Sequence, residues 1–258
     1  MGRQRRRITW QQARRRGLAP WRALGDRLFA GFRMRRRHAR IRDSVEQSGE
    51  TVYEEIANAV ISGVGAVLAA AGLALLIVLA AFTESAWAVA TSAIYGATLF
   101  LAFLFSSLYH GVWHRSTKSV FLALDHCSIF LLIAGTYTPI TLLSLPRPLG
   151  WVLFGILWGM AAMGVAVRLM TGQFHWLLVP VFLVMGWIGL PWVGTIFEHL
   201  GSGGAWLLFA GGLAYTGGVI FYLWRSLPFN HAVWHFFVFG GAVCHFLAVA
   251  IYAVPFAA

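Results

Sequence analysis

Residues 56–82 read IANAVISGVGAVLAAAGLALLIVLAAF, a run of apolar and small side chains without a charged residue. A helix that crosses the hydrocarbon core of a bilayer needs roughly 20 consecutive, mostly apolar residues. The run is longer than that minimum. It therefore predicts a transmembrane helix.

Six further stretches of this kind follow, separated by short polar segments or segments that contain glycine and proline. The expected spans are 56–82, 86–110, 119–144, 149–169, 175–197, 203–225 and 232–256. The sixth has the weakest helix propensity because it is rich in glycine, although glycine is common where membrane helices pack closely. The sequence predicts an all-α fold, a bundle of seven transmembrane helices in a membrane domain of residues 50–258.

The composition agrees with a membrane protein, since 59% of the residues are hydrophobic and 11% are charged. Soluble proteins carry roughly 25% charged residues. Of the 20 Lys and Arg residues, fifteen lie between Arg3 and Arg42, so the net charge of +11 belongs to a basic N-terminal arm, residues 1–49. The two cysteines, Cys127 and Cys244, lie in apolar stretches, and a disulfide framework is excluded.

The basic arm has two classes of expected partner, nucleic acid and anionic lipid headgroups. Because it precedes a membrane domain, lipid headgroups are expected and nucleic acid is not. Trp21, Leu24, Leu28 and Phe32 recur at helical spacing among arginines, which predicts an amphipathic helix on the membrane surface. A disordered tail that stays in the cytoplasm is the alternative.

The distribution of basic residues predicts the orientation, because cytoplasmic loops carry an excess of Lys and Arg. With the arm in the cytoplasm, Arg115, Lys118, Arg168 and Arg225 fall in cytoplasmic loops, and Arg147 alone falls outside. We therefore expect a cytoplasmic N-terminus and a C-terminus on the outside.

Five polar residues near the ends of spans are candidate functional residues, because polar side chains inside a membrane are costly. Ser106 and His110 lie four residues apart at the end of the second span, and Asp125 lies near the start of the third. His231 and His235 lie four apart at the start of the seventh. In the predicted topology these ends share the cytoplasmic side, so all five residues reach one depth.

Three imidazoles at one depth suggest a zinc ion, because zinc prefers nitrogen and sulfur ligands and catalytic sites combine three protein ligands with water. We take His110, His231 and His235 as the candidate metal ligands. Zinc lowers the pKa of its water to roughly 7. Asp125 is the candidate to orient or deprotonate that water, and Ser106 to hydrogen-bond it or a substrate oxygen.

A pair of histidines four residues apart is a weak signal alone, since the backbone or a headgroup often satisfies an interfacial histidine. His114 also lies four residues from His110 but borders the loop, where we expect it to be solvated. His126 must point elsewhere around its helix and is expected to be structural. His245 lies about 15 Å deeper than His235 at helical rise, where it would line a cavity or bond across helices.

The sequence resembles the hemolysin III proteins, the bacterial branch of the progestin and adipoQ receptor family, over roughly residues 50–256. The motifs that carry the resemblance are Glu54-Glu55-Ile56-Ala57-Asn58, Ser106-x3-His110, Asp125-His126-Cys127-Ser128-Ile129-Phe130 continuing to Ala134-Gly135-Thr136-Tyr137-Thr138-Pro139, and His231-x3-His235.

The resemblance implies a seven-helix bundle in a bacterial inner membrane with zinc near its cytoplasmic face. The zinc-binding histidines of the family fall on His110, His231 and His235, its aspartate on Asp125 and its serine on Ser106. The chain departs from its relatives at Ser62, where they usually carry a histidine that is not one of the three zinc ligands.

Three functions from different classes follow from these residues. A lipid hydrolase would use a zinc-activated water to cleave an amide or ester bond, and the ceramidases of the wider superfamily make a lipid amidase the natural expectation. A sensor or regulator of membrane state would use the zinc to hold the cytoplasmic helix ends together. A cytolytic protein is the least favoured, because no ring of charged residues suits a pore.

Overall fold

The computed structural model describes residues 48–171 and 178–256, and every element in them is helical. Nearly all of the N-terminal arm, predicted to be amphipathic or disordered, lies outside the described residues. The α-helices are α4 (Val52–Ala81), α5 (Ala86–Gly111), α6 (Arg115–Pro139), α7 (Arg147–Thr171), α8 (Leu178–Trp187), α9 (Val193–Leu223) and α10 (Asn230–Ala248). Short π-helical turns continue α6 over Ile140–Ser144 and α10 over Val249–Ala253, and 3-10 turns cover Leu190–Trp192 and Val254–Phe256.

Polar residues in the short connections begin the first helices. Thr51 and Glu54 form a capping box at α4, in which the Thr51 backbone N–H donates to Glu54 Oε2 at 2.7 Å and the Glu54 backbone N–H donates to Thr51 Oγ1. Ser85 caps α5 by accepting from the backbone N–H of Ala88. These bonds satisfy backbone donors that the first turn of a helix leaves free.

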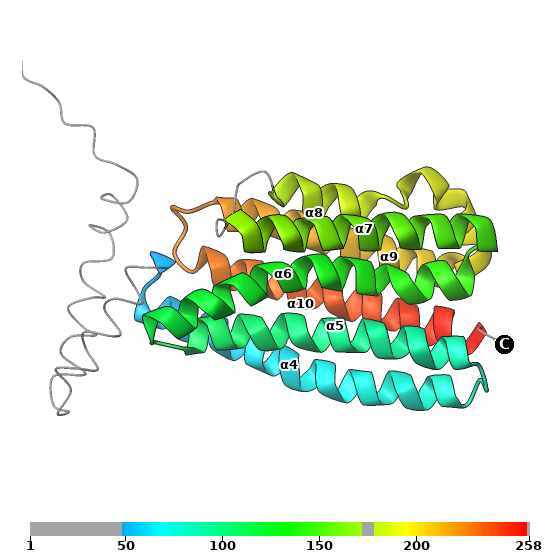
Figure 1. The fold of residues 1–258 in the computed structure, drawn as a ribbon, viewed down its shortest axis with the longest axis horizontal. Coiled ribbons are helices and arrows are strands. Elements are labelled where there is room, and N and C mark those ends of the chain that lie inside the picture. The colour runs from blue at the N-terminus through cyan, green and yellow to red at the C-terminus, as the bar shows by residue number, and fades with distance from the viewer. Residues whose placement is uncertain (1–47, 172–177, 257–258) are drawn as a thin grey trace, which may run out of the picture.

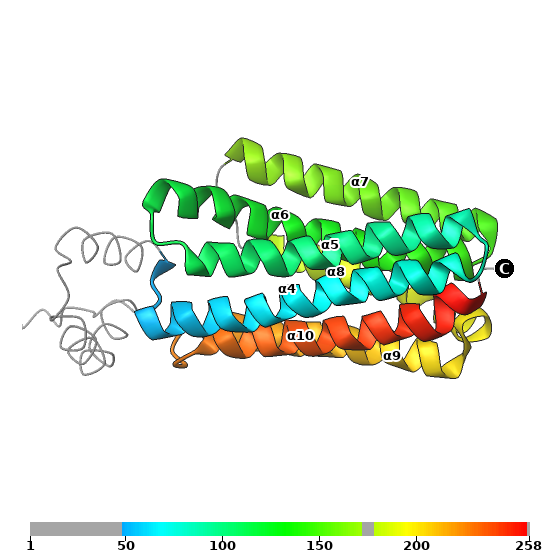
Figure 2. The same cartoon turned by 90° about the horizontal axis from the view of Figure 1, so that it is seen from below.

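The helices lie lengthwise beside one another and form one elongated bundle (Figures 1 and 2). The most extensive helix contacts are those of α4 with α5, followed by those of α9 with α10 and of α5 with α6. Tyr95, Leu99 and Phe103 of α5 belong to the main core, which continues to Val249 near the C-terminus. Large apolar side chains on the outer faces, such as Phe82 and Met170, are exposed, as expected of surfaces that meet lipid.

Six helical stretches of the described residues are long and apolar enough to cross a membrane, whereas the sequence predicted seven. The difference lies in Leu178–Leu223, which counts as one stretch of 46 residues. Inside it the backbone of Gly201 is non-helical, with φ 73° and ψ 162°. Trp187 Nε1 donates to Thr216 Oγ1 at 2.9 Å, so the chain folds back between these two residues.

Lys118, which the sequence placed in a loop before the span at 119, lies inside a helix, and that part of the prediction is wrong. Arg168 was also assigned to a loop, although it stands at the end of the expected span 149–169, and it lies inside a helix too. α6 begins at Arg115 rather than at 119, and Lys118 in its first turn is fully buried. Arg168 is buried near the end of α7 and donates from Nε to His126 Nδ1 at 3.1 Å. Each cation has a partner inside the bundle, which hydropathy and loop length do not reveal.

Candidate metal centre

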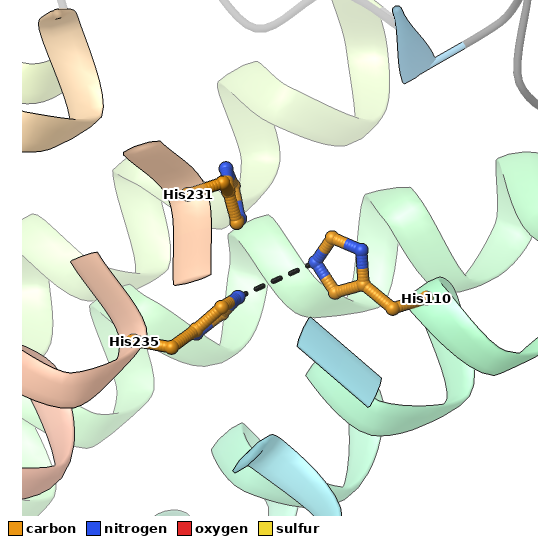
Figure 3. A group of neighbouring side chains, drawn as sticks. All are labelled: His110, His231 and His235. Atoms are coloured by element: carbon orange, nitrogen blue, oxygen red, sulfur yellow. Dashed lines mark hydrogen bonds between the residues drawn. The ribbon is translucent and has the colours of Figure 1, made fainter. Parts of the chain in front are cut away.

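Three histidines from two helices face one another near the end of the bundle where α4 begins (Figure 3). His110 comes from the last turn of α5, and His231 and His235 from consecutive turns of α10. One nitrogen of each ring lies within 4.8 Å of the others. The structure thus confirms that these histidines form a group that could hold a metal ion.

The spacing of two of these nitrogens suits a tetrahedral metal ion. His235 Nε2 and His110 Nε2 are 3.4 Å apart. Two nitrogens bound to one zinc ion at 2.0–2.1 Å with a tetrahedral angle are separated by about 3.4 Å. His110 and His235 are buried, and His231 is partly exposed, so the group is more open on the His231 side.

Glu55 holds the ring of His110 from the side opposite the other two histidines. Its Oε2 lies 2.8 Å from His110 Nδ1. A carboxylate accepts hydrogen bonds, so it favours the tautomer with the proton on Nδ1 and the lone pair on Nε2, the atom that faces His235. This carboxylate–histidine arrangement is the usual support of a metal ligand.

Lys118 balances the charge of Glu55 within the protein. Its Nζ lies 3.1 Å from Glu55 Oε2 and donates to the backbone oxygen of Tyr109 at 2.8 Å, and it also lies 4.5 Å from the centre of the Tyr109 ring. Both charged groups are fully buried. The pair therefore links the beginnings of α4 and α6 to the end of α5, which carries His110.

Ser106 and Asp125 line the same cavity as the histidines but are not part of the group of three converging nitrogens. The Ser106 hydroxyl lies close enough to the Asp125 carboxylate to interact with it. Ser62, which replaces the histidine that the resemblance led us to expect, has its Oγ 3.0 Å from Ser106 Oγ. The hydroxyls of Ser62 on α4 and Ser106 on α5 are therefore paired next to the Asp125 carboxylate on α6.

The histidines, Ser106 and Asp125 all line one cavity of about 410 Å³ inside the bundle. Most of its lining is apolar and comes from α5, α6, α8, α9 and α10, for example Phe103, Leu132, Phe182 and Val238. A cavity of this size and character suits a small or extended apolar ligand with its polar group near the histidines.

His114, His126 and His245 lie where the sequence placed them. His114 is exposed, and its Nδ1 pairs with the hydroxyls of Ser116 and Thr117. His126 pairs with Arg168, outside the group of three. His245 lies deeper, lines the cavity and also bonds across helices, with Nε2 3.0 Å from the Leu208 backbone oxygen.

Sequence reasoning undervalued Glu55 and missed Lys118 as parts of this site. Glu55 entered the sequence analysis only as part of the motif that leads into the first span, and in the structure it bonds across helices to a candidate ligand. The available signal was a carboxylate at the edge of the first apolar run with a lysine at the edge of the third, two charges placed where the membrane would penalise them if they were unpaired.

Comparisons with known proteins match most of the chain. The family model described as "Haemolysin-III related" matches residues 51–246. Hemolysin-3 of Bacillus cereus is 42% identical over 205 residues, 79% of this chain and 94% of that protein. The Hemolysin-3 homolog of Bacillus subtilis (strain 168) is 41% identical over 205 residues, 79% of this chain and 96% of that protein.

A more distant relative comes from animals. The monocyte to macrophage differentiation factor of Homo sapiens is 32% identical over 206 residues, 77% of this chain and 84% of that protein. The region matched by the family model contains the three histidines, Ser106, Asp125 and Glu55.

Proposed function

The chain belongs to the haemolysin-III related family, as its resemblance to the hemolysin III proteins predicted, and from that premise we propose that it is a zinc-binding membrane hydrolase. Its substrate is an acyl lipid, cleaved at an amide or ester bond. The observation that carries the proposal is the placement of three histidines, a carboxylate and a serine on one mostly apolar cavity.

The donor set favours a catalytic zinc over a structural one. Three histidine nitrogens converge, and the described residues add no fourth histidine, cysteine or carboxylate to that group. A structural zinc is commonly enclosed by four protein ligands, whereas a catalytic zinc keeps one position open. Zinc held by His110, His231 and His235 would supply Lewis acidity, which polarises a carbonyl and activates water at neutral pH.

The protein side chains then divide the remaining work. The Asp125 carboxylate accepts the proton of the attacking water and returns it to the departing amine or alcohol. The Ser106 hydroxyl orients that carboxylate, and the Ser62 hydroxyl in turn pairs with Ser106 at 3.0 Å. Glu55 keeps the proton of His110 on Nδ1, so that Nε2 faces the shared centre.

Crossing the bilayer seven times, from a cytoplasmic N-terminus to an outer C-terminus, is part of the proposal. The beginning of α4 and the C-terminus lie at opposite ends of the bundle, as an odd number of crossings requires (Figure 1). Leu178–Leu223 is divided at Gly201 into a first segment, made of α8, the 3-10 turn at Leu190–Trp192 and the start of α9, and a second helical segment, 202–223, of about 33 Å at helical rise. The second segment alone is long enough for a bilayer core.

The cellular setting follows from the same reasoning. We place the protein in a bacterial inner membrane, because two of its relatives are hemolysin-3 proteins of Bacillus species, which are bacteria. The basic arm of residues 1–49 would bind anionic lipid headgroups on the cytoplasmic surface. The histidine site then opens near that surface, within reach of lipid in the inner leaflet.

A regulatory role is the second candidate, and one feature favours it. The histidines join α5 to α10, and the Glu55–Lys118 pair joins α4 and α6 to the same end of α5. A metal ion there would fasten four helices at one end of the bundle. A non-enzymatic sensor of membrane state would use that fastening without needing Asp125.

The test measures zinc and lipid cleavage in the same purified samples. We expect about one zinc per chain in the wild type, loss of zinc in His231→Ala, and retained zinc with lost hydrolysis in Asp125→Asn. The probes are fluorescent N-acyl and O-acyl lipids in detergent micelles. Removing a general base typically costs 10²–10⁴-fold in rate.

His114→Ala is the matched control, because His114 lies four residues from His110 but pairs with Ser116 and Thr117 at the surface. It should keep both zinc and activity. A wild type that takes up no zinc when supplied with it would contradict the metal site. Zinc binding without hydrolysis of any probe, and equal stability of Asp125→Asn, would favour the regulatory role.

A further inference from the structure

The cavity extends well beyond the histidine site and ends among polar side chains. His245 lies ten residues after His235 on α10, which is about 15 Å deeper along the helix. Tyr215 from α9 lies against it, with ring centres 5.4 Å apart, and both residues line the cavity. Between this end and the histidines the lining is mostly apolar, so the cavity has two separate polar regions.

Only some of the hydrogen-bond donors and acceptors at the deep end have partners. Thr216 and Trp187 are satisfied, because Trp187 Nε1 donates to Thr216 Oγ1 and that hydroxyl donates to the Gly212 backbone oxygen at 2.8 Å. The Tyr215 hydroxyl, in contrast, forms no hydrogen bond with the part of the chain that the structure describes. It is free to donate one bond and to accept one.

His245 offers a complementary acceptor. Its Nε2 lies 3.0 Å from the Leu208 backbone oxygen, and a carbonyl only accepts, so Nε2 carries the proton. In a neutral imidazole, Nδ1 then carries a lone pair. The Nε2–Cδ2 edge of the ring faces α9 at Gly211, which leaves Nδ1 on the other side of the ring.

Two glycines leave the space that the rings of His245 and Tyr215 occupy. A Cβ atom at Gly211 of α9 would overlap the His245 ring, and one at Gly241 of α10 would meet the Tyr215 ring. Gly211 and Tyr215 lie one helical turn apart, as do Gly241 and His245. The His245 ring of α10 thus packs against Gly211 of α9, and the Tyr215 ring of α9 packs against Gly241 of α10.

A third polar group lies nearby without a partner. Tyr95 of α5 is fully buried, and its hydroxyl has no hydrogen-bond partner among the described residues. It is close enough to Tyr215 for the two phenols to interact electrostatically. A buried polar group without a partner costs about 1–3 kcal/mol, which is a reason to look for a missing ligand or water at this place.

We propose that Tyr215 and His245 form a second binding subsite, which recognises a hydroxyl group in the middle of the acyl chain of the lipid. A chain hydroxyl would donate to His245 Nδ1 and accept from Tyr215. The deep end has no cation to balance a carboxylate among the residues that line it there. This inference rests on the proposed function, because it takes the polar end of the lipid to lie at the histidine site.

The experiment compares the binding of three fatty acids, which are the products of acyl-lipid hydrolysis, to the zinc-loaded protein in detergent. The probes are octadecanoic acid, 2-hydroxyoctadecanoic acid and 12-hydroxyoctadecanoic acid. We expect the 12-hydroxy acid to bind about 2- to 10-fold more tightly than octadecanoic acid, the range for one net hydrogen bond. The 2-hydroxy acid tests whether the gain depends on position.

Tyr215→Phe removes only the unused hydroxyl and should abolish the preference without changing the affinity for octadecanoic acid or the thermal stability. Tyr137→Phe is the matched control, because Tyr137 lines the same cavity but donates to the Gly186 backbone oxygen at 2.7 Å. That variant should keep the preference.

Each outcome bears on one of the two proposals. Equal binding of octadecanoic and 12-hydroxy acids by the wild type, or a preference that survives Tyr215→Phe, overturns the subsite and leaves the lipid hydrolase standing. A gain of equal size for the 2-hydroxy acid also overturns it. If none of the three acids binds, the subsite fails together with the proposed function.

Discussion

At the scale of single residues, the buried pair of Glu55 and Lys118 links the metal site to the stability of the protein. Glu55 Oε2 serves both His110 and Lys118, and neither charge of the pair reaches solvent. Breaking a buried ion pair by removing one partner leaves an uncompensated charge, whereas replacing both partners by neutral groups is often tolerated. The two roles of Glu55 can therefore be separated by mutation.

Glu55→Gln is expected to lower the free energy of unfolding by about 3–5 kcal/mol, because Lys118 keeps its charge without a counter-ion. It should also weaken zinc binding by about 10- to 100-fold, the usual effect of losing a carboxylate behind a histidine ligand. Thermal unfolding in detergent measures the first effect, and competition with a chelator measures the second.

The double variant Glu55→Gln/Lys118→Met is the control for charge. It should regain most of the lost stability while zinc binding stays weak. Recovery of both properties in the double variant would show that Glu55 does not support His110 and that its effect on zinc arises only from the stability of the fold.

At the scale of helices, α9 and α10 depend on glycine for their close contact. The sequence marked the glycines of 203–225 as a weakness of the helix, and the structure shows what they permit. Besides Gly211 and Gly241, a Cβ at Gly218 would press against Phe237 and Trp234. Small residues of this kind let membrane helices approach closely and gain van der Waals contact.

Gly211→Ala is expected to lower the free energy of unfolding by about 1–3 kcal/mol, the cost of overpacking a filled interior. The added methyl group would overlap His245 and approach the Gly241 backbone oxygen, so α9 and α10 must separate. Gly240→Ala is the matched control, since a Cβ there meets nothing within 4 Å, and it should be neutral or slightly stabilising. Similar losses in both variants would contradict this packing.

At the scale of the whole molecule, the number of crossings decides on which side of the membrane each loop lies. With seven crossings, Glu84 and Ser202 face the outside, and Ser116 and Ser226 face the cytoplasm with the histidine site near them. All four positions are exposed in the bundle. They can therefore carry single cysteines in a background in which Cys127 and Cys244 are replaced by serine.

A membrane-impermeant maleimide should label cysteines at positions 84 and 202 in intact spheroplasts, and those at 116 and 226 only after permeabilisation. Position 202 is the decisive one, because it neighbours Gly201, where Leu178–Leu223 folds back. Failure to label position 202 from outside, while position 84 is labelled, would contradict a double crossing by this stretch.

Much of the fold and part of the site were accessible from the sequence because they depend on local chemistry. Long apolar runs and short polar connections predict roughly where helices begin and end, although α4 begins at Val52 rather than at the expected 56. Alternation of helix direction then brings the end of one helix and the start of others to the same side. That reasoning placed His110, His231 and His235 together, and the structure confirms the group.

The all-helical membrane class, the basic arm, the family and the three histidines could be inferred from the sequence alone, because apolar length, charge distribution and motif spacing are properties of the linear chain. The partner of each buried polar group is visible only in the folded bundle. Lys118 was assigned to a loop and lies instead on Glu55, and Gly211 makes room for His245 on the next helix. The physical reason is that inside a bundle a charge or a ring is stabilised by contacts from other helices, which spacing within one helix does not encode.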